Sequence, residues 1–228
     1  MIEGEVVVIS VGGSLIVPDS VDTHFLKAFA AFVRTHVGLG RRFVIITGGG
    51  KTARRYQAAA NEVAELTPTD LDWIGIHATR LNGHLLRTIF RDIAHAEVVR
   101  DPSKIRGVTE RVIVAAGWKP GCSTDYDAVL MAREVGAQKL INLSNIDYAY
   151  DKDPGVNADA QPITETDWKT FRALLPEKWD PGLSAPFDPV AAAEAERLGM
   201  EVAIINGERL EEVEKYLNGQ PFTGTRIA

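Results

Sequence analysis

The sequence predicts a three-layer α/β sandwich with a mainly parallel central sheet. Short runs rich in valine and isoleucine alternate with longer helical patterns, and each run is nearly continuous in apolar residues. Continuous apolar strands are typical of sheets buried on both faces, and strand–helix alternation is typical of parallel sheets. The 228 residues, of which 45% are hydrophobic and 25% charged, are enough to form one large domain with a substantial core.

Five strands and five helices carry this prediction. The expected strands cover residues 5–11, 42–47, 111–115, 139–143 and 201–206. The expected helices cover residues 22–36, 52–66, 71–94, 126–135 and 189–198. Asp22 is expected to cap the first helix, and Gly136 and Gly199 are expected to end the last two. The polar tract 151–161 is expected to be a loop.

Composition limits the classes of function. A formal net charge of −6 argues against a protein dedicated to binding a nucleic-acid polymer. The single cysteine, Cys122, excludes an intrachain disulfide and is typical of a reducing compartment. The first residues, MIEGEVVVIS, lack the basic region of a signal peptide, and their apolar stretch is too short to span a bilayer. We therefore expect a cytoplasmic protein without a membrane segment.

Glycines follow three of the expected strands. They are Gly12-Gly13 before Ser14, Gly48-Gly49-Gly50 before Lys51, and Gly117 after Ala116. Open α/β sheets bind ligands at the carboxyl ends of their strands, where glycine lets the backbone approach a ligand closely. The second glycine run leads through Lys51 into a helix whose first turn carries Arg54, and a helix N-terminus with nearby cations is a suitable receptor for phosphate.

The glycines have a purely structural interpretation as well, because tight strand-to-helix turns also need them. Three such endings, one of them beside two cations, favour phosphate binding over that alternative. The chain contains no GxxxxGK[ST] motif of a P-loop and no GxGxxG motif of a dinucleotide-binding fold. A phosphate ligand held by a different fold is therefore expected.

Five segments that follow one another in a fixed sequence order support this interpretation. The pattern covers nearly the whole chain, from the GGSL at residues 12–15 to the GTRI at residues 224–227. They read ITGGGKTARRY, DWIGIHATRLNGHLL, GWKPGCSTDYDA, LSNIDYAYDKDP and FDPVAAAEAERLG. Together they resemble the amino-acid-kinase superfamily, specifically its archaeal-type UMP kinases. The resemblance implies transfer of the γ-phosphate of ATP to UMP, with Mg²⁺ accompanying ATP, and a homo-oligomer, usually a hexamer built from dimers.

The resemblance also implies a set of site residues. The expected catalytic residues are Gly12, Gly13, Ser14, Lys51, Arg54, Asp125 and Asp188. The two aspartates among them resemble carboxylates that orient cationic groups and the magnesium–phosphate assembly. UMP would be bound by Gly49, Asp72, Gly117, Lys119, Pro120, Gly121, Cys122, Ser123 and Thr124. No residue is expected to bind a metal directly, because magnesium would be held through the ATP phosphates.

ATP is expected to bind at the remaining carboxyl ends of the strands, along the same edge of the sheet. Its implied contacts are Gly12, Gly13, Ser14, Gly50, Arg54, Ser144, Asn145, Asp147, Tyr150 and Asp153. Residues up to about 141 would hold the acceptor and residues from about 142 to 228 the ATP, within one domain. The family pattern ends in DGVY followed by DP, whereas Tyr148 and Ala149 replace its Gly-Val pair here.

One position departs from the bacterial relatives. These open with a lysine in the first strand that faces the γ-phosphate, and the corresponding residue is Ser10. Another cation must then supply the charge, and Lys51, Arg54 and Lys119 are the candidates. No general base is expected, because a phosphate oxygen of UMP is itself the nucleophile.

Two alternative functions stay open. One is a sister kinase of the same fold that acts on carbamate, an acyl amino acid or isopentenyl phosphate. The segments around Asp72 and at residues 119–124 favour a nucleotide, and no histidine lies between Gly48 and Tyr56, where an isopentenyl phosphate kinase would be expected to have one. The other is a protein that binds a nucleotide or a metal oxyanion for storage without turnover.

Overall fold

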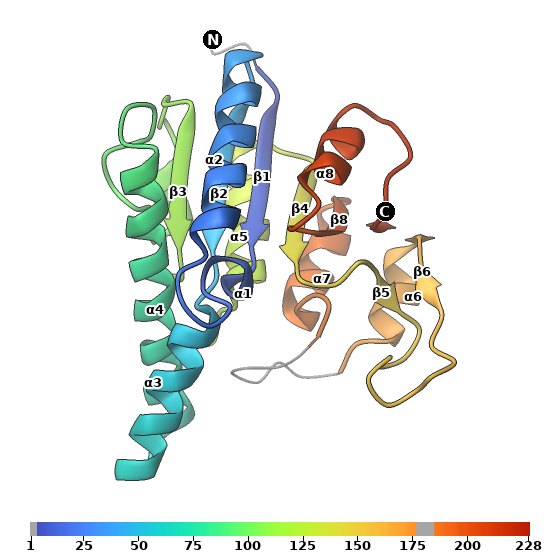
Figure 1. The fold of residues 1–228 in the computed structure, drawn as a ribbon. Helices are drawn as coiled ribbons and strands as arrows, with labels where there is room; N and C mark the ends of the chain where they lie inside the picture. Colours follow the sequence, from blue (N-terminus) through green and yellow to red (C-terminus); the bar gives the residue numbers. More distant parts are fainter. Residues whose placement is uncertain (1–3, 177–184) are drawn as a thin grey trace.

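The computed structural model describes residues 4–176 and 185–228, which form a helix-covered sheet of seven strands in the order β3-β2-β1-β4-β8-β9-β7 (Figure 1). The first five strands in this order pair in parallel. Strand β9 is antiparallel to β8 and parallel to β7. The seven strands are β1 (Val6–Val11), β2 (Arg42–Thr47), β3 (Val112–Ala116), β4 (Lys139–Ser144), β7 (Glu165–Thr166), β8 (Glu201–Asn206) and β9 (Thr225–Ile227).

Helices cover both faces of this sheet, and a separate antiparallel pair joins β5 (Ala149–Tyr150) to β6 (Pro162–Ile163). The helices are α1 (Gly13–Ile16), α2 (Thr23–Gly38), α3 (Gly50–Val63), α4 (Pro68–Ile89), the 3₁₀ helix η1 (Pro102–Ile105), α5 (Thr124–Val135), α6 (Trp168–Ala173), α7 (Pro189–Arg197) and α8 (Leu210–Leu217). No helix within residues 4–176 and 185–228 has the length and apolar character needed to cross a membrane.

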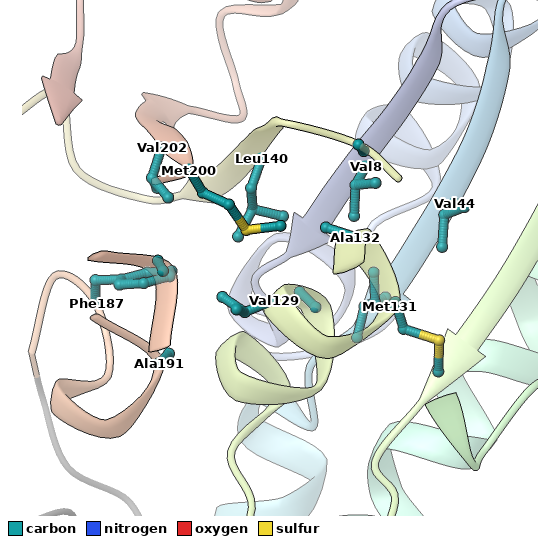
Figure 2. Close-up of a cluster of buried hydrophobic side chains, with 14 of the residues drawn as sticks. Val8, Val44, Val129, Met131, Ala132, Leu140, Phe187, Ala191, Met200 and Val202 are labelled. Carbon is teal, nitrogen blue, oxygen red and sulfur yellow. The ribbon is translucent and has the colours of Figure 1, made fainter. Parts of the chain in front are cut away.

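Alternate residues of each central strand enter two different cores. Val8 of β1 and Leu140 of β4 pack toward α5 and α7, where they meet Val129, Met131 and Ala191 (Figure 2). Their neighbours Val7, Ile9 and Ile141 pack toward α2 and α8 on the opposite face. Both faces of the sheet are therefore apolar, which explains why its strands are continuous runs of valine and isoleucine.

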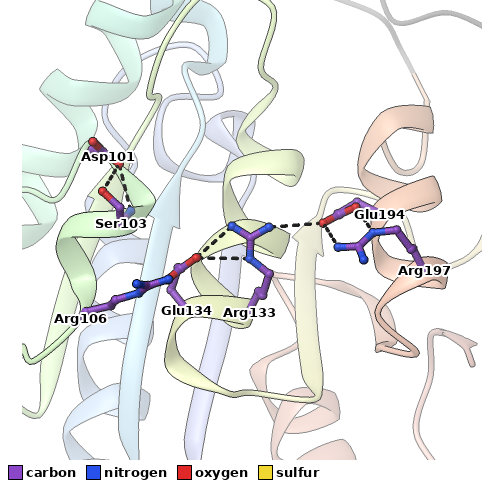
Figure 3. Close-up of polar contacts among 7 residues, drawn as sticks. All are labelled: Asp101, Ser103, Arg106, Arg133, Glu134, Glu194 and Arg197. Atoms are coloured by element: carbon purple, nitrogen blue, oxygen red, sulfur yellow. Dashed lines mark hydrogen bonds and ion pairs between the residues drawn. The ribbon is translucent and has the colours of Figure 1, made fainter.

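Ion pairs connect η1, α5 and α7 at the edge of the first of these cores (Figure 3). Glu134 of α5 pairs with Arg106 and Arg133, and Arg133 also lies 3.5 Å from Glu194 of α7. Arg197 completes the chain of charges with an Nη2–Oε1 distance of 2.7 Å to Glu194. The arginines of these pairs are exposed to solvent, whereas the side chains of Glu134 and Glu194 are largely buried. Solvent around the arginines weakens the pairs, so the buried apolar contacts beneath them hold the helices more strongly.

The predicted fold class is confirmed, and the five expected strands and five expected helices all form. Each expected strand lies within one residue of its observed bounds, because β-branched runs bounded by glycine or polar residues are unambiguous. Asp22 accepts hydrogen bonds from His24 and Phe25, and Gly136 and Gly199 have φ of 73° and 62°. The elements that were not expected are short: α1, η1, β5, β6, β7, α6, α8 and β9.

Candidate active site

Glycine loops from neighbouring parallel strands meet at the carboxyl edge of the sheet. The Gly12 N–H donates to Leu143 O of β4 at 2.8 Å, and the Gly48 N–H donates to Val11 O of β1 at 2.9 Å. A Cβ atom on Gly13 would overlap the backbone of Gly50, and a Cβ atom on Gly50 would overlap Gly13. Gly50 also has φ of +63°, which glycine adopts without strain. Only glycines allow the two loops to pack this closely.

A cleft of about 240 Å³ opens beside this junction and is called the first cleft here. Its walls come from the N-terminal turns of α3, the N-terminal half of α4 and the loop that follows β3. Its lining residues are Gly49, Gly50, Ala53, Arg54, Gln57, Asp72, Gly75, Ile76, Thr79, Gly117, Cys122, Ser123 and Thr124.

Buried side chains of α4 hold the backbone around the first cleft. Asn82 Nδ2 donates to Gly48 O at 2.8 Å, and Thr79 Oγ1 accepts from the Gly117 N–H at 2.8 Å. The position of Thr79 is fixed in turn by Thr47 of β2, whose hydroxyl donates to the Thr79 carbonyl at 2.9 Å. The glycine loops are thus anchored to a helix that packs on the sheet.

The three candidate cations differ in their surroundings. Lys51 Nζ lies 3.5 Å from Asp19 and is not among the residues lining the cleft. Lys119 Nζ lies 4.0 Å from the ring centroid of Trp118. Arg54 lines the first cleft and forms no ion pair with any of the residues that the structure describes. Of the three, Arg54 is the one that both lines the cleft and lacks a carboxylate partner in the described residues.

Two carboxylates lie between α5 and the start of α7, and Ser10 stands beside them. Ser10 Oγ donates to Asp125 Oδ1 at 3.1 Å, and the Asp188 N–H donates to Asp125 Oδ2 at 3.3 Å. Burial and the negative charge of Asp188 raise the pKa of Asp125 to about 6, and burial raises the pKa of Asp188. Asp188 Oδ1 caps α7, while its Oδ2 is buried without a hydrogen-bond partner in the described part of the chain.

No lysine or arginine within residues 4–176 and 185–228 forms an ion pair with Asp125 or Asp188. The serine at position 10 thus leaves the two carboxylates without the cation that a lysine would bring. Two buried acids that repel each other favour an incoming cation. In the same part of the chain, no group of three or more histidine, cysteine, aspartate or glutamate residues is arranged to hold a metal ion.

A second cleft of about 360 Å³ lies beyond β4 and is called the second cleft here. Ser144 and Asn145 at the end of β4 form one side, and apolar residues of α6 and the segments after it form the other. The complete lining is Ser144, Asn145, Ile146, Tyr148, Ala149, Tyr150, Asp151, Lys152, Asp153, Pro154, Phe171, Leu174, Leu175, Pro176, Ala185 and Pro186. This wall is rich in aromatic and aliphatic groups, which suits the flat face of a base.

The departure from the family's Gly-Val pair has a structural consequence. Tyr148 adds an aromatic ring to the wall of the second cleft, and Ala149 is buried with its N–H bonded to Thr225 Oγ1 at 2.8 Å. Asp147 does not line the cleft, because its carboxylate accepts from Asn206 at 2.7 Å and pairs with Arg209 at 3.2 Å. It joins the end of β4 to the end of β8.

The structure brings most of the expected site residues together. Gly49, Gly50, Arg54, Asp72, Gly117, Cys122, Ser123 and Thr124 line the first cleft, and Ser144, Asn145, Tyr150 and Asp153 line the second. Gly12 to Ser14 lie between them. Lys119, Pro120 and Gly121 belong to the same loop as the lining residues but do not line the first cleft themselves, and Lys51 and Asp147 lie outside both clefts.

Sequence reasoning missed several residues of the first cleft, namely Ala53, Gln57, Gly75, Ile76 and Thr79. The signal for those on α4 was helical spacing, since Asp72, Gly75, Ile76 and Thr79 recur on one face. Asp127 was not among the expected site residues, yet it is fully buried and accepts from the Trp118 N–H at 3.0 Å. Burial raises the pKa of Asp127 to about 7.

Asp72 faces the loop at residues 117–124, and Cys122 belongs to that loop. Asp72 Oδ2 accepts from the Gly121 N–H at 2.8 Å, so two expected contacts of UMP, the Asp72 carboxylate and this loop, also contact each other. Burial, reinforced by the charge of Asp127, raises the pKa of the Cys122 thiol to about 11. The thiol is therefore protonated near neutral pH and is not an activated nucleophile.

Comparison with known proteins identifies relatives over the whole of this architecture. The model of the amino acid kinase family matches residues 5–206. A uridylate kinase of Methanocorpusculum labreanum is 36% identical over 225 residues, covering 97% of this chain and 94% of the relative. A uridylate kinase of Hyperthermus butylicus is 33% identical and covers 94% of both chains. The crystal structure of uridylate kinase from Archaeoglobus fulgidus superposes with a TM-score of 0.81 at 28% identity, covering 98% of this chain and 100% of that one.

Proposed function

Because the chain belongs to the amino acid kinase family, we propose that it transfers the γ-phosphoryl group of ATP to UMP, giving UDP and ADP. The observation that carries this proposal is the placement of the loop at residues 12–14 between two clefts of different character. Gly13 packs on Gly50 of the first cleft, and Gly12 is bonded to Leu143, next to Ser144 of the second. Substrates in the two clefts would meet at this loop.

The first cleft suits a nucleotide acceptor. It combines the cation Arg54, which has no carboxylate partner among the described residues, with the N-terminus of α3 and the carboxylate of Asp72. Together these groups match a phosphate and the hydroxyl groups of a ribose. The second cleft combines Tyr148 and Tyr150 with Phe171 of α6 and the leucines that follow this helix, which match an adenine ring. We accordingly assign the acceptor to residues up to about 141 and ATP to the remainder.

The arrangement performs phosphoryl transfer by placement and charge. The attacking atom is a phosphate oxygen of UMP, which is ionised near neutral pH, so no protein base has to remove a proton from it. Backbone N–H groups of the 12–14 loop and the guanidinium of Arg54 would stabilise the charge that spreads over the transferred group. This role falls to Arg54, because Lys51 is paired with Asp19 and Ser10 is uncharged.

ATP-dependent phosphoryl transfer requires a divalent cation in general, and we propose Mg²⁺ for this enzyme. When bound, Mg²⁺ would neutralise part of the negative charge of the ATP phosphates. Asp125 and Asp188 fit that group, because both are acidic, no protein cation pairs with them in the described residues, and Asp188 Oδ2 is buried without a partner there. Their carboxylates would orient the magnesium–phosphate assembly.

We also propose that the protein self-associates, as a hexamer built from dimers. Large apolar side chains are exposed along α3 and α4, among them Tyr56, Val63, Trp73 and Leu81. A stripe of this kind on two adjacent helices favours burial against another copy. Light scattering on the purified protein measures the mass, and a monomeric mass would refute the assembly without affecting the proposed reaction.

The proposed reaction is tested by ADP release from Mg·ATP with UMP, CMP, dUMP, carbamate and isopentenyl phosphate supplied separately. Turnover that depends on UMP is the expected result. Turnover with carbamate or isopentenyl phosphate alone would keep the fold and overturn the acceptor. Tight ATP binding without turnover on any acceptor would instead identify a binding protein.

A further inference from the structure

The loop at residues 117–124 is held at its base by an unusual arrangement of side chains. The Gly117–Trp118 peptide is trans, like every peptide bond among the described residues, so its C=O and N–H groups point in opposite directions. Arg80 Nε of α4 donates to the Gly117 carbonyl at 3.2 Å, and Asp127 Oδ2 of α5 accepts from the Trp118 N–H at 3.0 Å. One peptide group is thus held from both sides, by the guanidinium group of Arg80 and by the carboxyl group of Asp127.

Two further bonds complete the hold on this dipeptide. Arg80 Nη2 donates to the Trp118 carbonyl at 2.8 Å, and Thr79 Oγ1 accepts from the Gly117 N–H at 2.8 Å. Every backbone polar group of Gly117 and Trp118 therefore has a side-chain partner. Gly117 itself is required, because a Cβ atom there would lie 2.9 Å from Thr79 Oγ1.

The tip of the same loop, residues 119–122, is held more weakly. In the part of the chain that the structure describes, its backbone bonds are the Gly121 N–H to Asp72 Oδ2 at 2.8 Å and the Cys122 N–H to Lys119 O at 3.3 Å. Cys122 of this tip lines the first cleft. Its position therefore depends on the orientation of the peptide at the base.

Asp127 has a simpler interpretation as an acid in the first turn of α5, where the helix dipole favours a negative charge. Two observations go beyond that interpretation. Its Oδ2 atom bonds outside the helix, to the Trp118 N–H, and its Oδ1 atom is buried with no partner among the described residues. A fully buried carboxyl group with one unsatisfied oxygen costs stability, and a helix-start acid exposed to solvent would avoid that cost.

We propose that Asp127 and Arg80 are positioning residues that fix the Gly117–Trp118 peptide and so set the affinity of the first cleft for the acceptor nucleotide. This inference rests on the proposed function, because it assigns the acceptor to that cleft. Neither side chain needs to touch the substrate. They act through the loop, which carries Cys122 into the cleft wall and leads into Ser123 and Thr124 at the start of α5.

The first test is steady-state kinetics of Asp127→Ala with UMP and ATP varied in turn. Loss of a hydrogen bond to a charged group should raise the KM for UMP on the order of 10-fold, with the KM for ATP within about twofold of the parent. Asp127→Asn, which keeps one acceptor for the Trp118 N–H at nearly unchanged volume, should recover most of the loss. Asp22→Asn, which changes an exposed helix cap, serves as the matched control.

The second test measures the loop directly by the rate at which iodoacetamide alkylates Cys122 in the ligand-free protein. Release of the peptide should accelerate alkylation several-fold in Asp127→Ala and in Arg80→Lys, which keeps the charge but loses the forked bond to two carbonyls. The control variant should react at the parent rate. This measurement does not depend on any activity.

The outcomes separate the inference from the function on which it rests. A parent protein without UMP-dependent turnover would remove the proposed function, while accelerated alkylation would still support the hold on the peptide. A folded Asp127→Ala variant with parental KM for UMP and parental alkylation would overturn the inference. If that variant does not fold, Asp127→Asn and Arg80→Lys decide the matter by the same two measurements, and equal rises in both KM values would also refute it.

Discussion

The first and second clefts lie at the same edge of one sheet but are built differently. The first is lined by glycines and by mostly small or polar side chains, and buried side chains such as Thr79 and Asn82 hold its glycine backbone in place. The second is walled by side chains of short elements, including Tyr148, Tyr150 and Phe171. The polyphosphate and the acceptor phosphate need closely placed N–H groups and charge, whereas an adenine ring needs apolar area.

This difference shows which substitutions each cleft should tolerate. In the first cleft a single added Cβ atom can overlap a neighbouring backbone, so a substitution there should disrupt the local fold before it changes any contact with a ligand. In the second cleft a truncated side chain leaves space but no collision, so the binding energy declines gradually. Substitutions in each cleft can test that distinction.

The largest expected effect is at the junction of the two glycine loops. Gly50→Ala should lower the free energy of unfolding by more than about 3 kcal/mol, because it combines positive φ with overlap on Gly13. Gly136→Ala is the matched control, since Gly136 also has positive φ but an added Cβ atom would have no neighbour within 4 Å. It should cost about 1 kcal/mol. Urea denaturation measures both, and equal costs would contradict the close packing of the loops.

The next largest effect is expected at Arg54, and it is compared with the effect at Lys51, one helical turn away. Arg54→Ala should reduce kcat/KM for UMP about 100-fold, because Arg54 supplies positive charge to the first cleft. Lys51→Ala should reduce it less than about threefold, since Lys51 pairs with Asp19 on the surface. Steady-state kinetics on both variants provides the measurement. A larger loss of kcat/KM in Lys51→Ala than in Arg54→Ala would assign the positive charge of the site to Lys51 instead.

A third pair of variants separates the two substrates. Asp72→Asn should raise the KM for UMP about 10-fold and leave that for ATP unchanged, because it weakens bonds to ribose hydroxyls and to the Gly121 N–H. Tyr150→Ala should raise the KM for ATP about 10-fold with little effect on UMP, since base stacking contributes about 1–3 kcal/mol. If both variants changed the same KM, the assignment of the clefts would be wrong.

The smallest effect concerns the thiol in the first cleft. With a pKa of about 11, Cys122 should be alkylated slowly at pH 7, and its rate should rise about tenfold per pH unit up to about pH 9. The alkylation rate should rise with pH because burial disfavours the thiolate, which is the reactive form. UMP should protect the thiol and ATP should not. Mass spectrometry of the alkylated protein gives the rate, and fast reaction at pH 7 would be inconsistent with a buried thiol.

Much of the fold could be predicted because its signals are local. The five parallel strands are continuous runs of apolar residues, and the helices between them begin or end at capping residues such as Asp22 and Gly136. The strands β7 and β9 could not be predicted in this way. They have two and three residues, and they form because β8 offers an unpaired edge, which is a tertiary circumstance.

The residues of the candidate site also divide into those that local signals predicted and those that depend on tertiary contacts. The glycine endings and Arg54 were visible in the sequence, because strand ends in a parallel sheet meet at one edge. The sequence left both Lys51 and Arg54 as candidates for the cation, and it did not reveal that Lys51 pairs with Asp19, which comes from another segment. It also did not reveal Tyr148 as a wall of the second cleft or Thr79 as an anchor of Gly117.

By itself, then, the sequence determined the five parallel strands, the main helices and the edge at which ligand binding is proposed, because hydrophobic periodicity and glycine act over a few neighbouring residues. Only the tertiary structure decided which charges are free, which are paired and which are buried. Asp127 shows why: it stands two residues from Asp125 in the same helical turn, yet the packing of α4, α5 and the 117–118 peptide around it gives it different partners. Burial and pairing depend on segments distant in the chain, and they set the chemistry of each carboxylate.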